Sequence, residues 1–220
     1  VFSRMPVCDL IAGIEPSAPD EIRDIADGLI YRDFITVGLL LSQVTVDGGT
    51  TGSKLAQALP SNWIYIQEPH VQVGRVQIFN NWSPYMVADP DTVWIGLEYF
   101  CNEGDALWVK DDPTLAALAA QELKEIGLAD PEDVLTSVVI RMPKTYPAYF
   151  GSYERFDRIR TYVDGFENLF LIGRNGMHRY NNQDHSMLAA MVAVDNISSG
   201  RMAKEAVWEV NTESDFHEER

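Results

Sequence analysis

The chain has 220 residues, 46% hydrophobic and 23% charged, a composition that is typical of a globular protein and excludes disorder over most of its length. Its 17 basic and 33 acidic residues give a net charge of −16, which excludes nucleic-acid binding as the main activity because an acidic surface repels phosphates. No apolar run reaches the roughly 20 residues that cross a bilayer, and no secretory signal begins the sequence. Cys8 and Cys101 are too few for a disulfide scaffold, so we expect reduced thiols and a cytoplasmic protein.

The first half of the chain predicts a short helix followed by a mainly antiparallel sheet. The helix is expected over residues 20–29, and a strand rich in Ile, Val, Leu and Phe follows over residues 31–41. Residues 47–53, with the sequence DGGTTGS, are predicted to form a loop. Within the strand predicted over residues 93–99, Glu98 is a candidate acid or base of a substrate site, or a rim residue of the sheet. Short strands separated by turn residues predict an antiparallel meander over residues 63–67, 76–80 and 93–99.

The clearest helix begins at Asp112 and Pro113, because Asp is a good N-cap and Pro is favoured at the first helical position. Gly127 is predicted to end this helix. Its apolar residues share one inward face: Leu115, Leu118, Ala119, Leu123 and Ile126.

A second helix is predicted over residues 153–163, after a strand over residues 137–142 that ends at Pro143. Residues 141–180 contain seven basic and four acidic side chains, a local charge of +3 within an acidic chain. This basic island indicates a small anionic ligand. The alternative is a solvated helix face with ion pairs between residues i and i+4, formed by Arg155, Arg158 and Arg160.

Residues 168–199 carry the pattern with the most chemical content. A wholly apolar strand over residues 169–172 is typical of a strand buried on both faces, and it leads into the turn GRNG at residues 173–176. A polar stretch follows, and a helix begins near Asp184 and ends at Gly200. We expect small residues to allow close backbone approach and larger ones to point inward: Ala189, Ala190 and Ala193, and Met187, Leu188, Met191 and Val192.

A strand, a glycine turn and a helix N-terminus together form a device for holding an anion or an electron-rich group. The first N–H groups of the helix have no partner within it, and the helix dipole adds partial positive charge. Arg174 and Arg179 add fixed positive charge to this end of the helix. A plain loop between a strand and a helix usually has about two to six residues, so the longer polar stretch here indicates a ligand. The amides in this stretch suit the edge of a heteroaromatic ring: Asn175, Asn181, Asn182 and Gln183.

Other chemistries have less support. His178, His185 and Asp184 lack the ligand spacing of a metal site, so we expect no metal. No G-x-S-x-G elbow is present for a nucleophilic serine, and the catalytic residues stay unassigned.

The same segments resemble a known family. The sequence YPAY at residues 146–149, the helix over 153–165 and above all residues 168–187 are similar to the C-terminal part of FAD-dependent proteins. These proteins are related to UDP-galactopyranose mutase and, more distantly, to protoporphyrinogen oxidase and flavin amine oxidases. The resemblance extends over nearly the whole chain, since SRMP at residues 3–6 and YRDF at residues 31–34 fit the substrate domain of this group.

The resemblance implies an α+β fold, in which a substrate domain has a mainly antiparallel sheet with flanking helices. The last strand, loop and helix of a Rossmann-like FAD-binding domain would follow. It implies a substrate-domain-like region at residues 1–165, the FAD-domain strand and helix at 166–200, and a tail at 201–220. The implied cofactor-binding residues, which would meet FAD, are Gly173, Arg174, Asn175, Asn182, Gln183 and Asp184. The implied binding residues for a small anionic substrate such as a nucleotide sugar are Tyr146, Arg179 and Tyr180.

The sequence lacks the N-terminal unit of such a protein, which is a strand, G-x-G-x-x-G and a helix that holds the FAD pyrophosphate. The nearest segment, GGTTG at residues 48–52, precedes no good helix and is expected to be a loop. Because the chain also begins at Val1, we expect an inactive C-terminal fragment of an FAD-dependent oxidoreductase or mutase, which binds FAD weakly or not at all alone. The alternative is a non-catalytic binding or oligomerisation module that has lost the flavin half, with residues 168–172 pairing with another chain.

Overall fold

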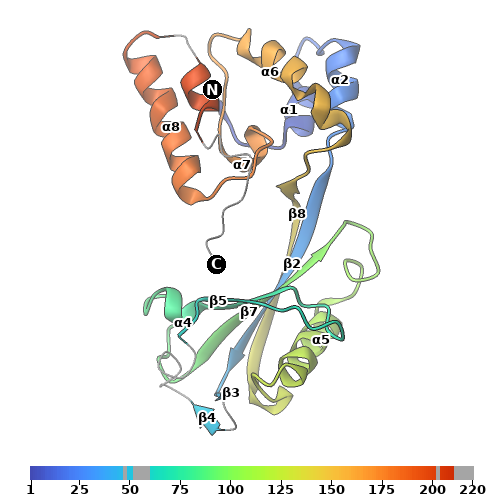
Figure 1. Ribbon diagram of the computed structural model, residues 1–220, viewed down its shortest axis with the longest axis vertical. Helices are drawn as coiled ribbons and strands as arrows, with labels where there is room; N and C mark the ends of the chain where they lie inside the picture. Colours follow the sequence, from blue (N-terminus) through green and yellow to red (C-terminus); the bar gives the residue numbers. More distant parts are fainter. Residues whose placement is uncertain (47–48, 52–59, 202–203, 211–220) are drawn as a thin grey trace. The chain divides into compact units, whose positions relative to one another are not determined.

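The structure, a computed structural model, describes residues 1–46, 49–51, 60–201 and 204–210 (Figure 1). The chain forms two compact units, which we call unit 1 (Val1–Arg32 and Lys144–Arg220) and unit 2 (Asp33–Pro143). Both contain helices and strands, which confirms the predicted mixture of α and β structure. The predicted boundary after residue 165 falls inside unit 1, and the functional assignment of the three predicted regions stays a prediction. Among the described residues, no helix is long and apolar enough to cross a membrane.

Unit 2 is organised around a five-stranded sheet in the order β5-β6-β7-β2-β8. Neighbouring strands from β5 to β2 pair antiparallel, which confirms the predicted meander. The predicted end of β8 at Pro143 is wrong, because β8 lies at the sheet edge, where a proline without an N–H is tolerated. The strands are β2 (Tyr31–Leu41), β5 (Trp63–Tyr65), β6 (Arg75–Ile78), β7 (Val93–Cys101) and β8 (Val134–Pro147).

Helix α5 (Asp112–Glu125) packs on one face of this sheet (Figure 1). Side chains alternate along a strand, so cross-strand partners such as Val37 and Leu97 share the same face. These strand residues form one core with the helix residues Leu115, Ala119 and Leu123, all fully buried, as the spacing predicts.

The ends of α5 follow from local chemistry. Its N-cap is Asp111, one residue earlier than predicted, and the Asp111 carboxylate accepts a hydrogen bond from the Thr114 backbone N–H at 2.9 Å. That hydrogen bond lowers the pKa of the Asp111 carboxyl. At the other end, Gly127 adopts a φ of +76° and ends the helix as predicted.

Shorter elements complete unit 2. β3 (Val44–Val46) and β4 (Gly49–Thr51) form an antiparallel hairpin, so part of the predicted loop over 47–53 is strand. The other residues of that loop and of the GGTTG segment lie outside the described residues. A short helix α4 (Phe79–Trp82) precedes β7, and a 3-10 turn η1 (Pro131–Asp133) precedes β8.

Three helices of unit 1 pack around a common core. α1 (Val7–Gly13), α2 (Asp20–Asp27) and α6 (Phe156–Asp164) lie side by side (Figure 1). The predicted helix over 153–163 is confirmed from Phe156, and its first residues form the 3-10 turn η2 (Gly151–Arg155). The apolar faces of these helices meet in one core, which includes Ile11, Ile22, Ile25, Ile159 and Val163.

Two very short strands form a small sheet in unit 1. β1 (Phe2–Ser3) and β9 (Phe170–Leu171) pair in parallel, with the Phe170 N–H donating to the Val1 carbonyl and the Ile172 N–H to the Ser3 carbonyl, both at 2.9 Å. Phe170 and Leu171 are buried, as the apolar pattern predicts. Within the described residues no third strand joins this sheet.

The chain continues through α7 (Gly173–Gly176) to α8 (Gln183–Ser198). The predicted inward positions of α8 are wrong for Met187, Leu188 and Met191, which are exposed. The packed face consists instead of small residues, with Ala189 and Ala193 fully buried as predicted. Apolar residues surround most of α8, so periodicity alone cannot select the face that packs.

The beginning of the predicted tail is folded. α9 (Glu205–Trp208) follows α8, and its residues Val207 and Trp208 are buried in the core of unit 1. Residues 211–220 lie outside the described residues.

Candidate functional site

The turn that follows β9 is built by two glycines. Gly173 adopts a φ of +72°, a conformation that other residues rarely adopt. A Cβ on Gly176 would lie 2.5 Å from the Ser3 carbonyl oxygen, so only glycine fits this close approach to β1. The turn therefore holds Arg174 and Asn175 in fixed positions beside the start of the chain.

Arg174 contacts two other predicted site residues, Tyr146 and Tyr180. Its Nε and Nη2 donate to the Asn181 carbonyl at 3.1 and 2.9 Å. Its guanidinium lies 4.2 Å from the centre of the Tyr180 ring and 5.1 Å from that of Tyr146. The two tyrosine rings are stacked, with centroids 5.8 Å apart and planes 11° apart. We call Arg174, Tyr146, Tyr180 and Asn181 the Arg174 cluster.

The N-terminus of α8 lies at the end of the same loop. Asn182 is the N-cap, and its backbone N–H donates to Nδ1 of His185 at 3.3 Å. Asn181 is buried, and its side-chain oxygen accepts from the Ser186 hydroxyl at 2.8 Å. Asn182, Gln183 and Asp184, all predicted to bind the cofactor, are exposed at this helix end.

Asn175 contributes a different feature. Its side-chain oxygen is buried and has no hydrogen-bond partner within the described residues. A buried acceptor without a partner costs about 1–3 kcal/mol, which is the penalty that a ligand or water removes by donating to it. Asn175 therefore lies where an added donor is favoured.

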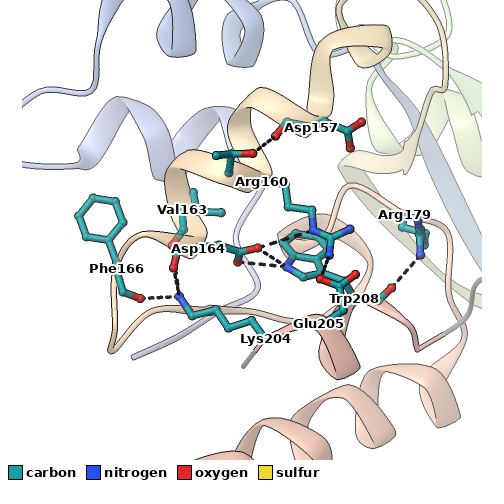
Figure 2. Close-up of polar contacts among 10 residues, drawn as sticks. Asp157, Arg160, Val163, Asp164, Phe166, Arg179, Lys204, Glu205 and Trp208 are labelled. Carbon is teal, nitrogen blue, oxygen red and sulfur yellow. Dashed lines mark hydrogen bonds and ion pairs between the residues drawn. The ribbon is translucent and has the colours of Figure 1, made fainter. Parts of the chain in front are cut away.

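Arg179 lies apart from the Arg174 cluster in its contacts. Its Nη1 donates to the Trp208 carbonyl at 3.0 Å, and its side chain lines a cavity of about 260 Å³ (Figure 2). The cavity lies within unit 1 and has an aromatic and apolar part and a charged part. It is lined by Tyr153, Glu154, Phe156, Asp157, Arg160, Met177, Arg179 and Trp208.

Polar contacts beside this cavity join α9 to α6. Figure 2 shows Trp208, whose Nε1–H donates to both Asp164 carboxylate oxygens at 3.1 Å. Arg160 lies 5.2 Å from the Trp208 ring centre and pairs with Glu205 at 2.5 Å. Lys204 donates to backbone carbonyls at the end of α6, and burial lowers the pKa of its ammonium group. These contacts hold α9 against α6.

Three further basic residues of the island are also paired. Arg158 pairs with Glu21 at 3.2 Å, Lys144 with Asp9 at 2.6 Å and Arg141 with Asp112 at 2.7 Å. Arg160 also pairs with Asp164 at 3.6 Å at the predicted i,i+4 spacing. The i,i+4 alternative describes Arg160, whereas Arg158 pairs with a residue of α2, and Arg174 carries the argument for an anionic ligand.

His178 has a structural position. It is fully buried with a φ of +45°, and its Nε2–H donates to the Ala148 carbonyl at 3.1 Å. Its ring packs 4.7 Å from that of Tyr31, and burial lowers the pKa of its imidazole. Within the described residues, no group of three or more His, Cys, Asp and Glu side chains is arranged to hold a metal.

Glu98 is a buried ion-pair residue. It is 2% exposed and accepts from Nε of Arg75 at 2.7 Å and from the side-chain amide of Gln77. The Arg75 guanidinium lies 4.6 Å from the Trp63 ring. Its burial on the central strand β7 contradicts the rim assignment, and the acid or base assignment stays a prediction.

Asn181 and Tyr149 were not among the predicted cofactor- and substrate-binding residues, although Asn181 was one of the four amides expected to suit a ring edge. Asn181 anchors the Arg174 guanidinium, and the Tyr149 hydroxyl accepts from the Tyr180 N–H at 2.5 Å. Burial raises the pKa of the Tyr149 phenol. The amide-rich loop and the YPAY segment carried the signal for both, but not their contacts.

The fold has relatives among solved structures. A reduced UDP-galactopyranose mutase matches with a TM-score of 0.74 and 22% identity, over 96% of this chain and 43% of that one. A protein described as a protoporphyrinogen oxidase from Exiguobacterium sp. 255-15 matches with a TM-score of 0.62 and 16% identity, over 91% and 41% of the two chains. No protein-family model and no curated protein sequence matches.

These likenesses establish the fold. They confirm the predicted resemblance to this group of proteins at the level of fold, and the chain spans less than half the length of both of these structures.

Proposed function

We propose that this chain supplies one side of the active site of an FAD-dependent enzyme, either an oxidoreductase or a sugar-nucleotide mutase. The observation that carries the proposal is the position of the Arg174 cluster in the loop that leads directly to the exposed N-terminus of α8. The likeness in fold to a UDP-galactopyranose mutase supports it. In this proposal the chain is the C-terminal part of a longer protein.

The residues at the α8 terminus fit the flavin of FAD. The orphaned oxygen of Asn175 is an acceptor for a ring N–H, and the exposed amides of Asn182 and Gln183 offer both donors and acceptors. Gly173 has no side chain that would block the approach of a ligand to the backbone of the turn. Asp184 lies in the first turn of α8. Bound FAD would supply reversible electron uptake, and the positive end of α8 would stabilise negative charge on the reduced ring.

The Arg174 cluster fits an anionic substrate. The hydroxyls of Tyr146 and Tyr180 donate to phosphate-type oxygens, and the guanidinium beside their rings favours negative charge nearby. Arg174 is held by the Asn181 carbonyl, so its position requires no ligand. A nucleotide sugar has the required diphosphate. Arg179, engaged by the Trp208 carbonyl, supports the loop from the other side.

The test is flavin retention in the longer protein that contains this chain. Arg174→Ala removes the guanidinium that holds the Asn181 carbonyl, and with it the anchor of the loop that leads to the proposed flavin site at the α8 N-terminus. We therefore expect FAD affinity to fall by about tenfold or more. Arg155→Ala is the matched control, because Arg155 belongs to the same basic island and is exposed. Flavin is measured by visible absorbance after gel filtration. Equal retention by Arg174→Ala and the wild type would contradict the assigned role.

A second candidate function has one specific observation in its favour. α8 presents large apolar side chains to solvent, which suits a binding or oligomerisation module without catalysis. Light scattering after size exclusion distinguishes the two, because a module that pairs with its own copies changes mass with concentration. A monomer at every concentration argues against that candidate.

A further inference from the structure

The five-stranded sheet of unit 2 has two edges, which differ in how they are protected against pairing with another chain. At one edge, β5 (Trp63–Tyr65) has only three residues. At the other edge, β8 (Val134–Pro147) runs for 14 residues, and no other described strand pairs with its outer side. An edge strand presents a row of backbone N–H and C=O groups, and short length, charged side chains and prolines are the usual protection. β8 is therefore the edge at which a further strand can pair.

Only the second part of β8 carries such protection. Arg141, Pro143 and Lys144 lie there, and Lys144 adopts a φ of +54°, which departs from strand geometry. Residues 134–140, with the sequence VLTSVVI, contain no charge, no proline and no glycine, and five of the seven side chains are β-branched. This composition is typical of segments that pair with other strands. We call residues 134–140 the open edge.

The open edge is exposed on both faces of the sheet. Leu135 is 57% exposed, Val138 45% and Ile140 48%, and Thr136 and Ser137 are exposed as well. Side chains alternate between the two faces along a strand, so Leu135 and Val138 lie on opposite faces. A strand added beside them would cover apolar surface on both faces, in addition to the hydrogen bonds that it makes with the backbone.

The charges that flank the open edge favour a second copy in antiparallel orientation. Glu132 and Asp133 precede the open edge, and Arg141 follows it. In an antiparallel pair of identical strands the acidic end of each lies beside the basic end of the other, whereas a parallel pair would bring like charges together. Asp133 and Arg141 lie opposite one another when Ser137 is on the two-fold axis, because each is four residues from Ser137.

The flanking charges also have partners in their own chain. The Asp133 carboxylate accepts from the side-chain amide of Gln43 at 2.9 Å, and Arg141 pairs with Asp112 at 2.7 Å. Surface ion pairs contribute little energy, so these charges select orientation and register, while backbone hydrogen bonds and apolar contact supply the affinity. The uncharged open edge suits two copies of a chain of net charge −16, because no like charges meet within it.

We propose that the open edge pairs antiparallel with the open edge of a second copy, with Ser137 on the two-fold axis. The two five-stranded sheets then form one continuous sheet. The axis is perpendicular to that sheet, so both α5 helices lie on the same face. The proposal concerns unit 2 and does not rest on the proposed function, since the pairing needs no flavin.

The first test is disulfide cross-linking of single-cysteine variants of residues 1–220 by oxidised glutathione, read by non-reducing electrophoresis. All variants carry Cys8→Ser, because Cys8 is half-buried, whereas Cys101 is only 2% exposed. Ser137→Cys is expected to give a covalent dimer. Residues directly opposite in antiparallel strands have Cα atoms about 4.5–5.5 Å apart, which is within reach of a disulfide.

Leu135→Cys is the matched control, because it is exposed on the same strand. In the proposed register Leu135 and its copy lie four residues apart along the pair, about 14 Å, which is too far for a disulfide. Equal cross-linking of the two variants, or no dimer from Ser137→Cys, would overturn the proposal.

The second test is the mass from light scattering after size exclusion at increasing concentration. The mass of the wild-type chain is expected to rise from one copy toward two. Leu135→Lys places a charge on the open edge and should hold the mass at one copy. Tyr85→Lys, at a loop residue that is 95% exposed, is the control and should pair like the wild type. A wild-type mass of one copy at every concentration, or pairing that Leu135→Lys does not weaken, would overturn the proposal.

The same measurement separates β8 from the exposed apolar residues of α8. Met191→Lys changes α8 at a residue that is 60% exposed and should leave the pairing intact. A mass change that Met191→Lys removes and Leu135→Lys leaves would overturn the proposal in favour of pairing through α8. A mass well above two copies would also contradict it, because a two-fold pair is closed.

Discussion

The two longest helices among the described residues, α5 in unit 2 and α8 in unit 1, differ in the exposure of their large apolar residues. In α5 the stripe Leu115, Ala119 and Leu123 is buried against the sheet. In α8 alanines pack and methionines face solvent. α5 has a polar face that leaves one choice of packing, whereas α8 has two apolar faces. In such a helix the hydrophobic period alone does not select the side that packs.

The largest expected effect on stability comes from replacing a large apolar side chain of α5 by alanine, compared with the same change in α8. Leu123→Ala leaves a cavity in the core of unit 2 and should lower the free energy of unfolding by about 2–5 kcal/mol. Met191→Ala removes an exposed side chain and should change it by less than about 0.5 kcal/mol in residues 1–220. Urea titrations followed by tryptophan fluorescence measure both. Similar losses for the two variants would mean that α8 packs through its methionines.

A smaller effect is expected from Glu122, the charged residue on the packed side of α5. Glu122 is 3% exposed and accepts from the backbone N–H groups of Gln72 at 2.7 Å and Val73 at 3.1 Å. Glu122→Ala leaves both donors without an acceptor and should cost about 1.5–3 kcal/mol. The exposed neighbour Glu125 provides the control variant Glu125→Ala. Equal stability of the two variants would show that water replaces the carboxylate.

These helices also show how far sequence reasoning reaches. β2 follows from its content of Ile, Val, Leu and Phe, and the apolar stripe of α5 follows from a period-3.6 pattern. Glu122 carried no such signal, since its partners lie in a distant loop. The glycine turn and Arg174 were predicted from their motif. The stacking of Tyr146 on Tyr180 depends on two segments that only tertiary packing brings together.

Unit 1 should lose stability in mild acid through His178. Burial lowers the pKa of this imidazole, so the folded state favours the neutral form and stability is complete above the unfolded pKa of about 6.5. Stability falls as the pH decreases below that value, by at most about 1.4 kcal/mol per pH unit. Unfolding midpoints at about pH 7.5 and 5.5 should differ less in His178→Phe than in the wild type. The same difference in both proteins would contradict the assignment.

The smallest loss is expected at the N-cap of α5. Asp111→Ala removes the acceptor for the Thr114 N–H and should cost about 1 kcal/mol, whereas Asp111→Asn keeps an acceptor and should cost less. Thermal unfolding of the three proteins at constant pH measures the order. A loss as large for Asn as for Ala would mean that charge at the helix end, and not the hydrogen bond, is the stabilising contribution.

The most direct test of the account is the amount of FAD bound per chain, measured by visible absorbance for residues 1–220 alone and for the longer protein that contains them. One side of a flavin site should bind FAD weakly or not at all alone. In the longer protein we expect close to one FAD per chain. Stoichiometric FAD in residues 1–220 alone, or none in either protein, would contradict the account.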